Sequence, residues 1–474
     1  MKAKPDSPAA GKHDAELLAR YTTQQPSVDE RMAAGKALRQ KVPHERHADY
    51  KPAPKRQDPV AILEAQAKTR LADLVPIRYA RMLASPFSFL RGSAAVMAAD
   101  LAHTPVSGLT VQANGDMHLA NFGLFASAER NLVFGINDFD ETLPGAWEWD
   151  LKRLAASAVV AVRFMGGDKV LCEEVARAAV RSYRKRMREY AGMGNLEVWY
   201  SSIDEPRILA ALTPEAQAIG ERIMIKARQR GHMQVLEKMS ELVDNQQRIV
   251  EDAPLIVRET HTADGRPIAE VLARTLEQYL ASLPDDRKQL FSRYRIMDVA
   301  RKVVGVGSVG TRCWIILMNG NGTDDPLFLQ YKEAQPSVLA PYSKTSRWEC
   351  EGKRVVVGQR LIQGAPDIFL GWGIQKEGGH FYMRQLRDMK GGAAFDPKNV
   401  KSMPQYCKLC GWALSLAHAK SGDPAMIAGY LGKSEGMDEA IVRFAFAYAE
   451  QTDRDYDSLV KAAREKRVRV AKAT

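Results

Sequence analysis

With 474 residues, of which 45% are hydrophobic, the chain exceeds a single ordinary core and is expected to fold into two or three domains or lobes. Its five cysteines argue against a disulfide-bonded secreted scaffold, and the lack of an apolar leader or of an apolar run of about 18 residues predicts a cytoplasmic protein without membrane contact. The formal net charge of +11 is accompanied by no recognised nucleic-acid-binding module, so nucleic acid is not an expected partner.

The amino-terminal part divides into two regions. Residues 1–58 are rich in Lys, Arg, His and Pro and poor in large apolar side chains, which predicts a flexible basic tail that packs little. Residues 60–105 carry apolar residues such as Leu63 and Leu74 at helical spacing. We expect this helical region to begin a larger lobe that spans residues 59–299.

Residues 106–140 combine short strands with residues that suit phosphoryl transfer from a metal-bound nucleotide. Asp116 and Asn121 are separated by an interval at which one loop can present a carboxylate to a substrate hydroxyl and an amide oxygen to Mg²⁺. An apolar stretch then leads to Asp138 and predicts a strand that ends in a second oxygen ligand for the same ion. The neighbouring Asp140 and Glu141 could bridge a second metal ion, although a turn or helix-start role is more frequent for short acids.

Residues 151–299 are predicted to be almost entirely helical, and residues 300–388 to form a small antiparallel β-rich nucleotide lobe. This lobe contains a G-x-G-x-x-G pattern made by Gly305, Gly307, Ser308 and Gly310. Two apolar runs separated by a turn follow it, and this strand-turn-strand context favours a loop that covers phosphates over a dinucleotide-binding loop, in which the third glycine opens a helix. An ordinary hairpin turn is the alternative.

Three further residues complete the predicted nucleotide lobe. Lys332 ends the second strand of the hairpin, where a kinase places the lysine that holds the α- and β-phosphates. The helix predicted over residues 347–363 offers Glu351 as the acid that pairs with this lysine, with Gln359 as runner-up and a solvated first-turn acid as the alternative role of Glu351. Met383, in the expected last strand, is assigned to the hinge that meets the nucleotide base.

At these residues the chain resembles the protein kinase-like superfamily, in particular its aminoglycoside phosphotransferase and choline kinase branch, whose catalytic loop reads Gly-Asp-x-His-x-x-Asn. The resemblance implies ATP or GTP with Mg²⁺, Asp116 as catalytic base, and Asn121 and Asp138 as metal ligands. It also implies that Asp150 is a buried acid that braces the catalytic loop. His118 either contacts the substrate or phosphate or is packed as scaffold, and the scaffold role is favoured.

Over nearly its whole length the chain also looks like a bacterial family known as domain of unknown function 2252. This likeness is carried by residues 85–92, 115–123, 137–150, 358–361 and 384–388. The family supplies no substrate.

The order of the motifs differs from that of a kinase, because the glycine loop and Lys332 follow the catalytic loop by about 190 residues. We therefore expect a circularly permuted, two-lobed kinase-like α+β fold, in which residues 389–474 return to the larger lobe. Residues 409–419 look like the helix that normally precedes a catalytic loop. The unpermuted alternative makes Asp423 the base, but position 428 is Ala instead of Asn.

These patterns predict an ATP- or GTP-dependent phosphotransferase that acts on a hydroxyl of a small molecule or a protein. Two alternatives stay open. A kinase-like enzyme can transfer AMP by binding the nucleotide reversed, and a catalytically silent nucleotide-binding regulator would use the basic tails to contact a partner. The pattern specifies neither the acceptor nor an oligomeric state.

Overall fold

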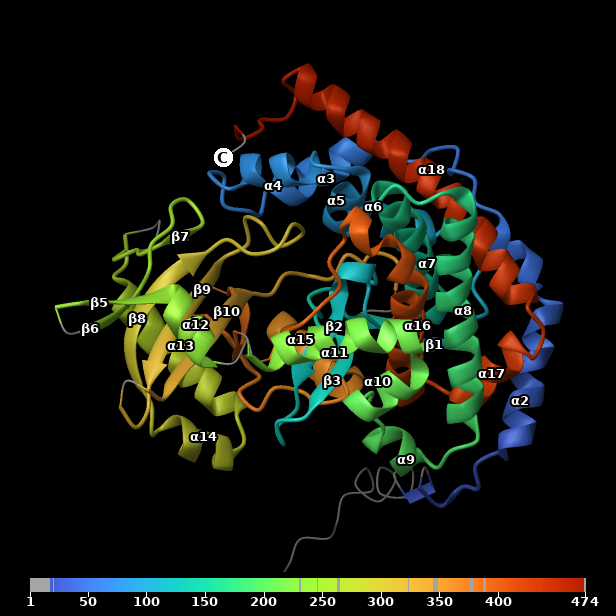
Figure 1. Cartoon of the computed structure of the whole chain (residues 1–474), viewed down its shortest axis with the longest axis horizontal. Coiled ribbons are helices and arrows are strands. Elements are labelled where there is room, and N and C mark those ends of the chain that lie inside the picture. The colour runs from blue at the N-terminus through green and yellow to red at the C-terminus, as the bar shows by residue number, and fades with distance from the viewer. Residues whose placement is uncertain are drawn as a thin grey trace, which may run out of the picture.

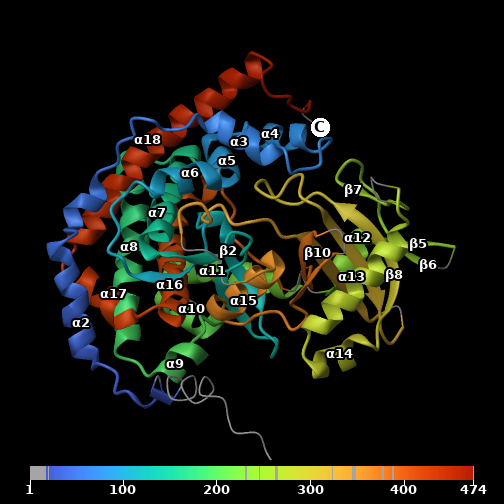
Figure 2. The ribbon, with the colours of Figure 1, turned by 180° about the vertical axis from the view of Figure 1, so that it is seen from behind.

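The computed structural model describes residues 18–19, 21–229, 232–244, 246–261, 265–322, 324–343, 348–375, 378–386 and 389–472. These residues form a large, mainly helical lobe and a smaller lobe built on a six-stranded sheet (Figures 1 and 2). The predicted α+β class is confirmed at this level. Within the described ranges, no helix has the length and apolar character needed to cross a membrane.

Four long helices build the core of the large lobe: α7 (Trp147–Phe164), α8 (Lys169–Ala191), α16 (Met403–Ser421) and α18 (Gly436–Arg464). Helix α7 is buried on all sides, and α8 packs against both α7 and α16. A Cβ atom at Gly411 would lie 2.0 Å from the carbonyl oxygen of Ala179, so this glycine permits the close approach of α16 and α8.

Shorter helices complete the large lobe, and six of those named below begin at a Ser or Asp whose side chain accepts a hydrogen bond from a first-turn N–H group. In chain order they are α2 (Val28–Ala37), η1 (Leu38–Gln40), η2 (His44–Ala48), α3 (Pro59–Ala67), α4 (Val75–Met82), α5 (Pro86–Gly92), α6 (Ala94–Leu101), α9 (Asn195–Tyr200), α10 (Glu205–Ala211), α11 (Pro214–Gln229), η4 (Pro397–Ser402) and α17 (Pro424–Leu431).

The prediction of a flexible tail over residues 1–58 is wrong for residues 27–58, which form an ordered arm; residues 1–17 and 20 lie outside the described part. Helix α2 packs on α17, where a Cβ atom at Gly35 would lie 2.0 Å from the carbonyl oxygen of Met426. Arg56 then binds the carboxylates of Asp100 and Asp455. Close helix contact, ion pairs and a few apolar side chains such as Tyr50, which packs on Phe444 and Tyr448, hold this arm, so it needs few of the large apolar residues whose scarcity suggested a tail.

Two small antiparallel pairs position residues 114–121 and residues 137–142, which are named the catalytic loop and the metal loop after the roles predicted for them above. Strand β1 (Thr110–Ala113) pairs with β4 (Leu143–Ala146), and β2 (Phe122–Ala126) pairs with β3 (Leu132–Ile136). The short helix η3 (Leu119–Asn121) lies between β1 and β2. The register places residues 114–121 beside residues 137–142.

The sheet of the small lobe has the order β11-β12-β10-β9-β8-β7, with every neighbouring pair antiparallel. The strands are β7 (Ile256–Val257), β8 (Arg295–Lys302), β9 (Cys313–Asn319), β10 (Pro326–Glu333), β11 (Gly371–Ile374) and β12 (His380–Gln385). Helix α15 (Glu351–Ile362) connects β10 to β11 and contacts both the sheet and α16 of the large lobe.

The predicted helical block over residues 151–299 is wrong in its last part. Strands β5 (Ser240–Val243) and β6 (Gln246–Ile249) form a hairpin, and β7 and β8 join the sheet. Apolar residues of α12 (His232–Met239), α13 (Ile268–Ser282) and α14 (Asp285–Phe291) pack on strands of the sheet. The small lobe therefore begins well before residue 300. The sequence did not show this because an amphipathic pattern predicts that a helix has an apolar face but not which lobe this face covers.

Candidate functional site

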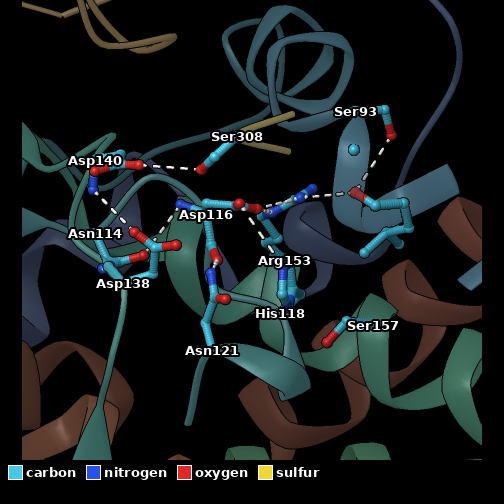
Figure 3. Close-up of polar contacts among 12 residues, drawn as sticks. Ser93, Asn114, Asp116, His118, Asn121, Asp138, Asp140, Arg153, Ser157 and Ser308 are labelled. Carbon is cyan, nitrogen blue, oxygen red and sulfur yellow. Dashed lines mark hydrogen bonds and ion pairs between the residues drawn. The ribbon is translucent and has the colours of Figure 1, made fainter. Parts of the chain in front are cut away.

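The catalytic loop, the metal loop and the glycine loop meet at the junction of the two lobes, around a cavity of about 130 Å³. Asp116, Asn121, Asp138 and Ser308 all line this cavity. Figure 3 shows Asp116 between Arg153 on one side and the loop of Asp138 and Asp140 on the other. The structure thus brings together residues from the two segments that lie far apart in the sequence.

Asp150, in the first turn of α7, holds the start of the catalytic loop in place. Its carboxylate accepts hydrogen bonds from the N–H groups of Asn114 at 2.6 Å and Gly115 at 2.9 Å, and His418 Nε2 lies 3.2 Å away. Gly115 has a φ of +82°, a conformation that side chains other than glycine rarely adopt. Asp150 therefore occupies the bracing position that the family resemblance implies for it.

Asp116 is bound by Arg153, a residue of α7 that the sequence motifs do not include. Arg153 Nε donates to Asp116 Oδ1 at 2.9 Å, and Nη2 contacts the same oxygen. Oδ2 remains for another ligand, with His118 Nε2 at 3.7 Å. Burial raises the pKa of the Asp116 carboxyl, although the charge of Arg153 opposes this. The carboxylate is thus fixed in orientation while one oxygen faces the cavity.

His118 is buried, and its Nδ1 has no hydrogen-bond partner among the described residues. Burial, together with the nearby charges of Arg153 and Arg91, holds the pKa of His118 well below its usual value. The ring is therefore neutral at physiological pH and packed beneath the loop, which fits the scaffold role.

Asn121 and Asp138 offer oxygen atoms to the same cavity. Asn121 Nδ2 donates to the carbonyl oxygen of Asp116 at 2.7 Å, and the N–H of Asn137 donates to the carbonyl oxygen of Asn121 at 2.8 Å. An amide and a carboxylate suit Mg²⁺, which keeps waters and phosphate oxygens as its other ligands. Among the described residues no group of three His, Cys, Asp or Glu side chains could hold a metal alone.

Lys332 reaches the metal loop from β10. Its buried Nζ contacts Asp140 Oδ2 and lies 4.0 Å from Asp138 Oδ1. Although burial opposes it, the carboxylates of Asp138 and Asp140 hold the pKa of Lys332 well above its usual value. Tyr382 Oη and Ser308 Oγ also donate to Asp140. Asp140 is therefore the partner of Lys332, a role that its position in the sequence did not indicate.

The predicted pairing of Glu351 with Lys332 is wrong. Glu351 is the first residue of α15, and its carboxylate accepts a hydrogen bond from Arg354 one turn further along the helix. Arg354 also donates to the carbonyl oxygens of Asp140 at 3.0 Å and Thr142 at 2.6 Å. The predicted helix spans residues 347–363, whereas α15 begins at Glu351. Arg347 lies outside the described residues. Helix α15 thus contacts the metal loop through an arginine.

The assignment of Met383 to the hinge concerns its backbone and stays a prediction, whereas its side chain lies on the face of the sheet away from Lys332. Lys332 is opposite Tyr382 in the sheet, so Tyr382 shares the face of Lys332 and Met383 lies on the other face. Met383 is fully buried in the cluster that contains Tyr279 of α13. The alternation of side chains along β12 places Arg384 on the Lys332 side, where Arg384 Nε donates to Gln330 at 3.2 Å.

The glycine loop joins β8 to β9 as a strand-loop-strand unit, and its residues 305–308 line the cavity. Gly305 and Gly310 have φ values of +64° and +90°. Arg81 of α4 contacts the carbonyl oxygen of Gly305, and Ser308 Oγ donates to Asp140 at 3.3 Å (Figure 3). The loop is therefore held close to the catalytic and metal loops.

Asp423, the base of the unpermuted alternative, caps α17 by accepting from the N–H groups of Ala425 and Met426. It is absent from the lining of the cavity. Gly422 lies against β1, where a Cβ atom would be 3.2 Å from the carbonyl oxygen of Thr110. The end of α16 therefore adjoins the strand that leads into the catalytic loop.

Glu141 gives the site a predicted pH dependence. Burial raises the pKa of its carboxyl to about 7, reinforced by Asp140 and Asp116 and opposed by the N–H of Val338 and the charge of Arg354. The folded protein thus binds this proton more tightly than the unfolded chain, so the stability that Glu141 contributes is full below pH 4.5 and is lost as the pH rises through about 7.

Glu141→Gln is expected to remove this component, which amounts to roughly 3 kcal/mol at most. The free energy of unfolding of the variant should then fall less steeply than that of the wild type between about pH 5 and pH 8. Urea unfolding at a series of pH values measures both slopes. Identical slopes would show that Glu141 titrates normally.

Comparison with known proteins assigns the chain to a family. The family model described as "uncharacterized protein conserved in bacteria (DUF2252)" matches residues 70–462, which include all three loops of the cavity. The chain therefore belongs to this family, as the resemblance of its motifs implied. No curated protein and no solved structure gives a significant match.

Proposed function

We propose that this protein is an ATP- or GTP-dependent phosphotransferase with a circularly permuted kinase-like fold. The observation that carries the proposal is the 4.0 Å distance between Lys332 Nζ and Asp138 Oδ1, in a site where Asp138 shares one cavity with Asp116 and Asn121. Lys332 and Asp116 belong to different lobes and lie 216 residues apart in the sequence. Side chains that suit phosphate, metal and hydroxyl thus converge from separate parts of the chain.

The topology of the small lobe supports this proposal. In chain order the glycine loop lies between its strands β8 and β9, Lys332 is on β10, and α15 precedes β11 and β12. This is the arrangement that the kinase resemblance implies for a nucleotide lobe. The contact of Gly422 with β1 supports the permutation, because it places α16 where an unpermuted chain would enter the catalytic loop.

The proposed chemistry assigns one task to each group. Asp116 Oδ2 accepts the proton of the acceptor hydroxyl, and Arg153 keeps that carboxylate in place. Lys332 exchanges its contact with Asp140 for the phosphates, which the glycine loop covers. Asn121 and Asp138 would hold Mg²⁺, which neutralises phosphate charge when bound.

A catalytically silent nucleotide-binding regulator is the second candidate, and one observation favours it. Lys332 already pairs with Asp140, and Asp116 with Arg153, so both charged groups have partners within the protein. Transfer of AMP would use the same residues with the nucleotide reversed. The acceptor in either enzymatic case is a small molecule or a protein.

Binding of Mg-nucleotide should stabilise the whole fold, because the groups that hold it come from both lobes. At a hundredfold excess over the dissociation constant, the free energy of unfolding should rise by about 2.7 kcal/mol. Thermal melts with Mg-ATP, Mg-GTP and each nucleotide without Mg²⁺ measure this effect.

Two variants test whether the shift in melting temperature arises at the proposed metal site. Asp138→Asn should lose the Mg²⁺-dependent part of the shift, whereas Asp423→Asn, which changes the cap of α17 and the ion pair with Arg31 away from the cavity, should keep it. If no nucleotide shifts the melting temperature of the wild type, the proposed function is wrong.

A further inference from the structure

Three arginines from outside the kinase-like motifs line the cavity next to Asp116. Arg70 precedes α4, Arg78 lies within α4, and Arg91 lies within α5. All three belong to the helical segment that precedes the catalytic loop in this chain; the charge of Asp116 acts on Arg91, and the charges of Glu141 and Asp140 act on Arg70.

None of the three arginines forms an ion pair with a carboxylate of the described residues within 4.0 Å. Arg78 is only 1% exposed, and its Nη2 donates to Gln66 Oε1 at 2.9 Å and to the carbonyl oxygen of Gly92 at 3.0 Å. Its Nε and Nη1 have no partner in the described part of the chain, nor do the Nε atoms of Arg70 and Arg91. Arg91 stacks on the ring of Phe87, 5.9 Å from its centroid.

Burial lowers the pKa of each of the three guanidinium groups, that of Arg78 to about 9 with the charge of Arg70 contributing. All three nevertheless stay charged at neutral pH. Buried cations are costly unless an anion or several hydrogen-bond acceptors face them. Arginine also presents a planar array of donors that matches the oxygens of carboxylates and phosphates. The cluster is therefore complementary to an oxyanion.

The position of the cluster indicates which molecule would carry this anion. Lys332 and the metal ligands are the proposed contacts of the nucleotide phosphates, whereas Arg91 acts electrostatically on Asp116, the proposed base. The carbonyl oxygen of Arg91 also lies against the glycine loop, 3.3 Å from the position of a Cβ atom at Gly307. A molecule whose hydroxyl meets Asp116 Oδ2 would therefore extend toward the arginines.

We propose that the acceptor is a small hydroxyl compound that carries a phosphate or carboxylate group, and that Arg70, Arg78 and Arg91 bind this group. The proposal rests on the proposed phosphotransfer. In that reaction the bond from the γ-phosphorus to the bridging oxygen of the nucleotide breaks, and a bond from phosphorus to the acceptor oxygen forms. The hydroxyl proton passes to Asp116 and then to water, which leaves a nucleoside diphosphate and the phosphorylated acceptor.

The anion site is tested without nucleotide by calorimetric titration of inorganic phosphate into the full-length protein. Arg78→Gln and Arg91→Gln should each weaken binding at least tenfold, and two variants are needed because Arg78 also bonds to Gly92. Arg177→Gln is the matched control, since Arg177 lies on α8 and pairs with Glu173. Phosphate that does not bind, or binds equally to all variants, overturns the proposal.

A second titration, in the presence of a saturating Mg-bound non-hydrolysable ATP analogue, separates acceptor from nucleotide. Unchanged phosphate affinity supports the acceptor site, whereas competition shows that the arginines hold nucleotide phosphates and overturns it. If phosphate binds but the analogue does not, the anion site stands and the proposed function fails.

Three matched probes then identify the anion. Glycerol 3-phosphate and glycerate each combine a hydroxyl with an oxyanion, and glycerol lacks the charge. Arginine-dependent binding of either anionic probe but not of glycerol supports the proposal and shows which oxyanion is preferred. Equal binding of all three probes contradicts it.

Discussion

Asp116→Asn is expected to lower turnover by about 10² to 10⁴ while the affinity for nucleotide stays nearly unchanged. The substitution preserves size and most hydrogen bonding but removes the group that accepts the hydroxyl proton. Arg153 would still find an oxygen acceptor in the amide, so the loop should keep its position. Steady-state phosphate transfer or nucleotide hydrolysis measures turnover, and calorimetry measures affinity.

Asp138→Asn provides the contrast for this experiment. A neutral amide is a poorer ligand for a hard cation, so this variant should lose Mg²⁺-dependent nucleotide binding as well as turnover. Asp116→Asn should therefore lower turnover alone, whereas Asp138→Asn should lower both turnover and nucleotide affinity. If Asp116→Asn matches the wild type in an assay with measurable activity, Asp116 is not the base.

Lys332→Met should have the second large effect, on both stability and binding. Without the lysine, the carboxylates of Asp138 and Asp140 face each other with no cation between them. Removing one partner of a buried ion pair typically costs about 3 to 5 kcal/mol, and because the two aspartates are partly exposed we expect roughly 2 kcal/mol. Nucleotide affinity should fall at least tenfold, since the phosphates lose their cation. Urea unfolding and calorimetry measure these effects.

A double-mutant cycle isolates the cause of the destabilisation. Adding Asp140→Asn to Lys332→Met removes one of the two like charges and should restore part of the lost stability. Strictly additive losses would show that the pair of Lys332 and Asp140 is not coupled in the folded protein.

The sequence predicted those parts of the site that are contiguous. The catalytic loop from Gly115 to Asn121 is one short segment, so its motif and its geometry coincide, and the apolar runs of β3, β9 and β10 predict buried strands directly. Arg153 was missed because it lies on α7, 37 residues after Asp116, and only the packing of this helix beside the loop brings the two together.

The errors concern features that depend on exact boundaries or on tertiary packing. Glu351 and Arg354 are neighbours one turn apart on α15, and the packing of this helix leaves the Glu351 carboxylate on Arg354 and not on Lys332. In a strand successive side chains point to opposite faces, so the side chain of Met383 points away from Lys332 and only its backbone is left for the predicted hinge. The arm over residues 27–58 is held by contacts with α17 and α18, which no local pattern reveals.

Transfer of a labelled phosphoryl group tests the central claim most directly. The wild-type protein, Mg²⁺ and ATP labelled at the γ-phosphate would be incubated with a bacterial small-molecule extract, in parallel with Asp116→Asn and with ATP labelled at the α-phosphate. We predict that the γ-label appears on an acceptor with the wild type, that the Asp116 variant lacks this product, and that the α-label stays on the nucleotide. Nucleotide that binds without transfer of either label would contradict phosphotransfer and favour the silent regulator, and transfer of the α-label would identify AMP as the transferred group.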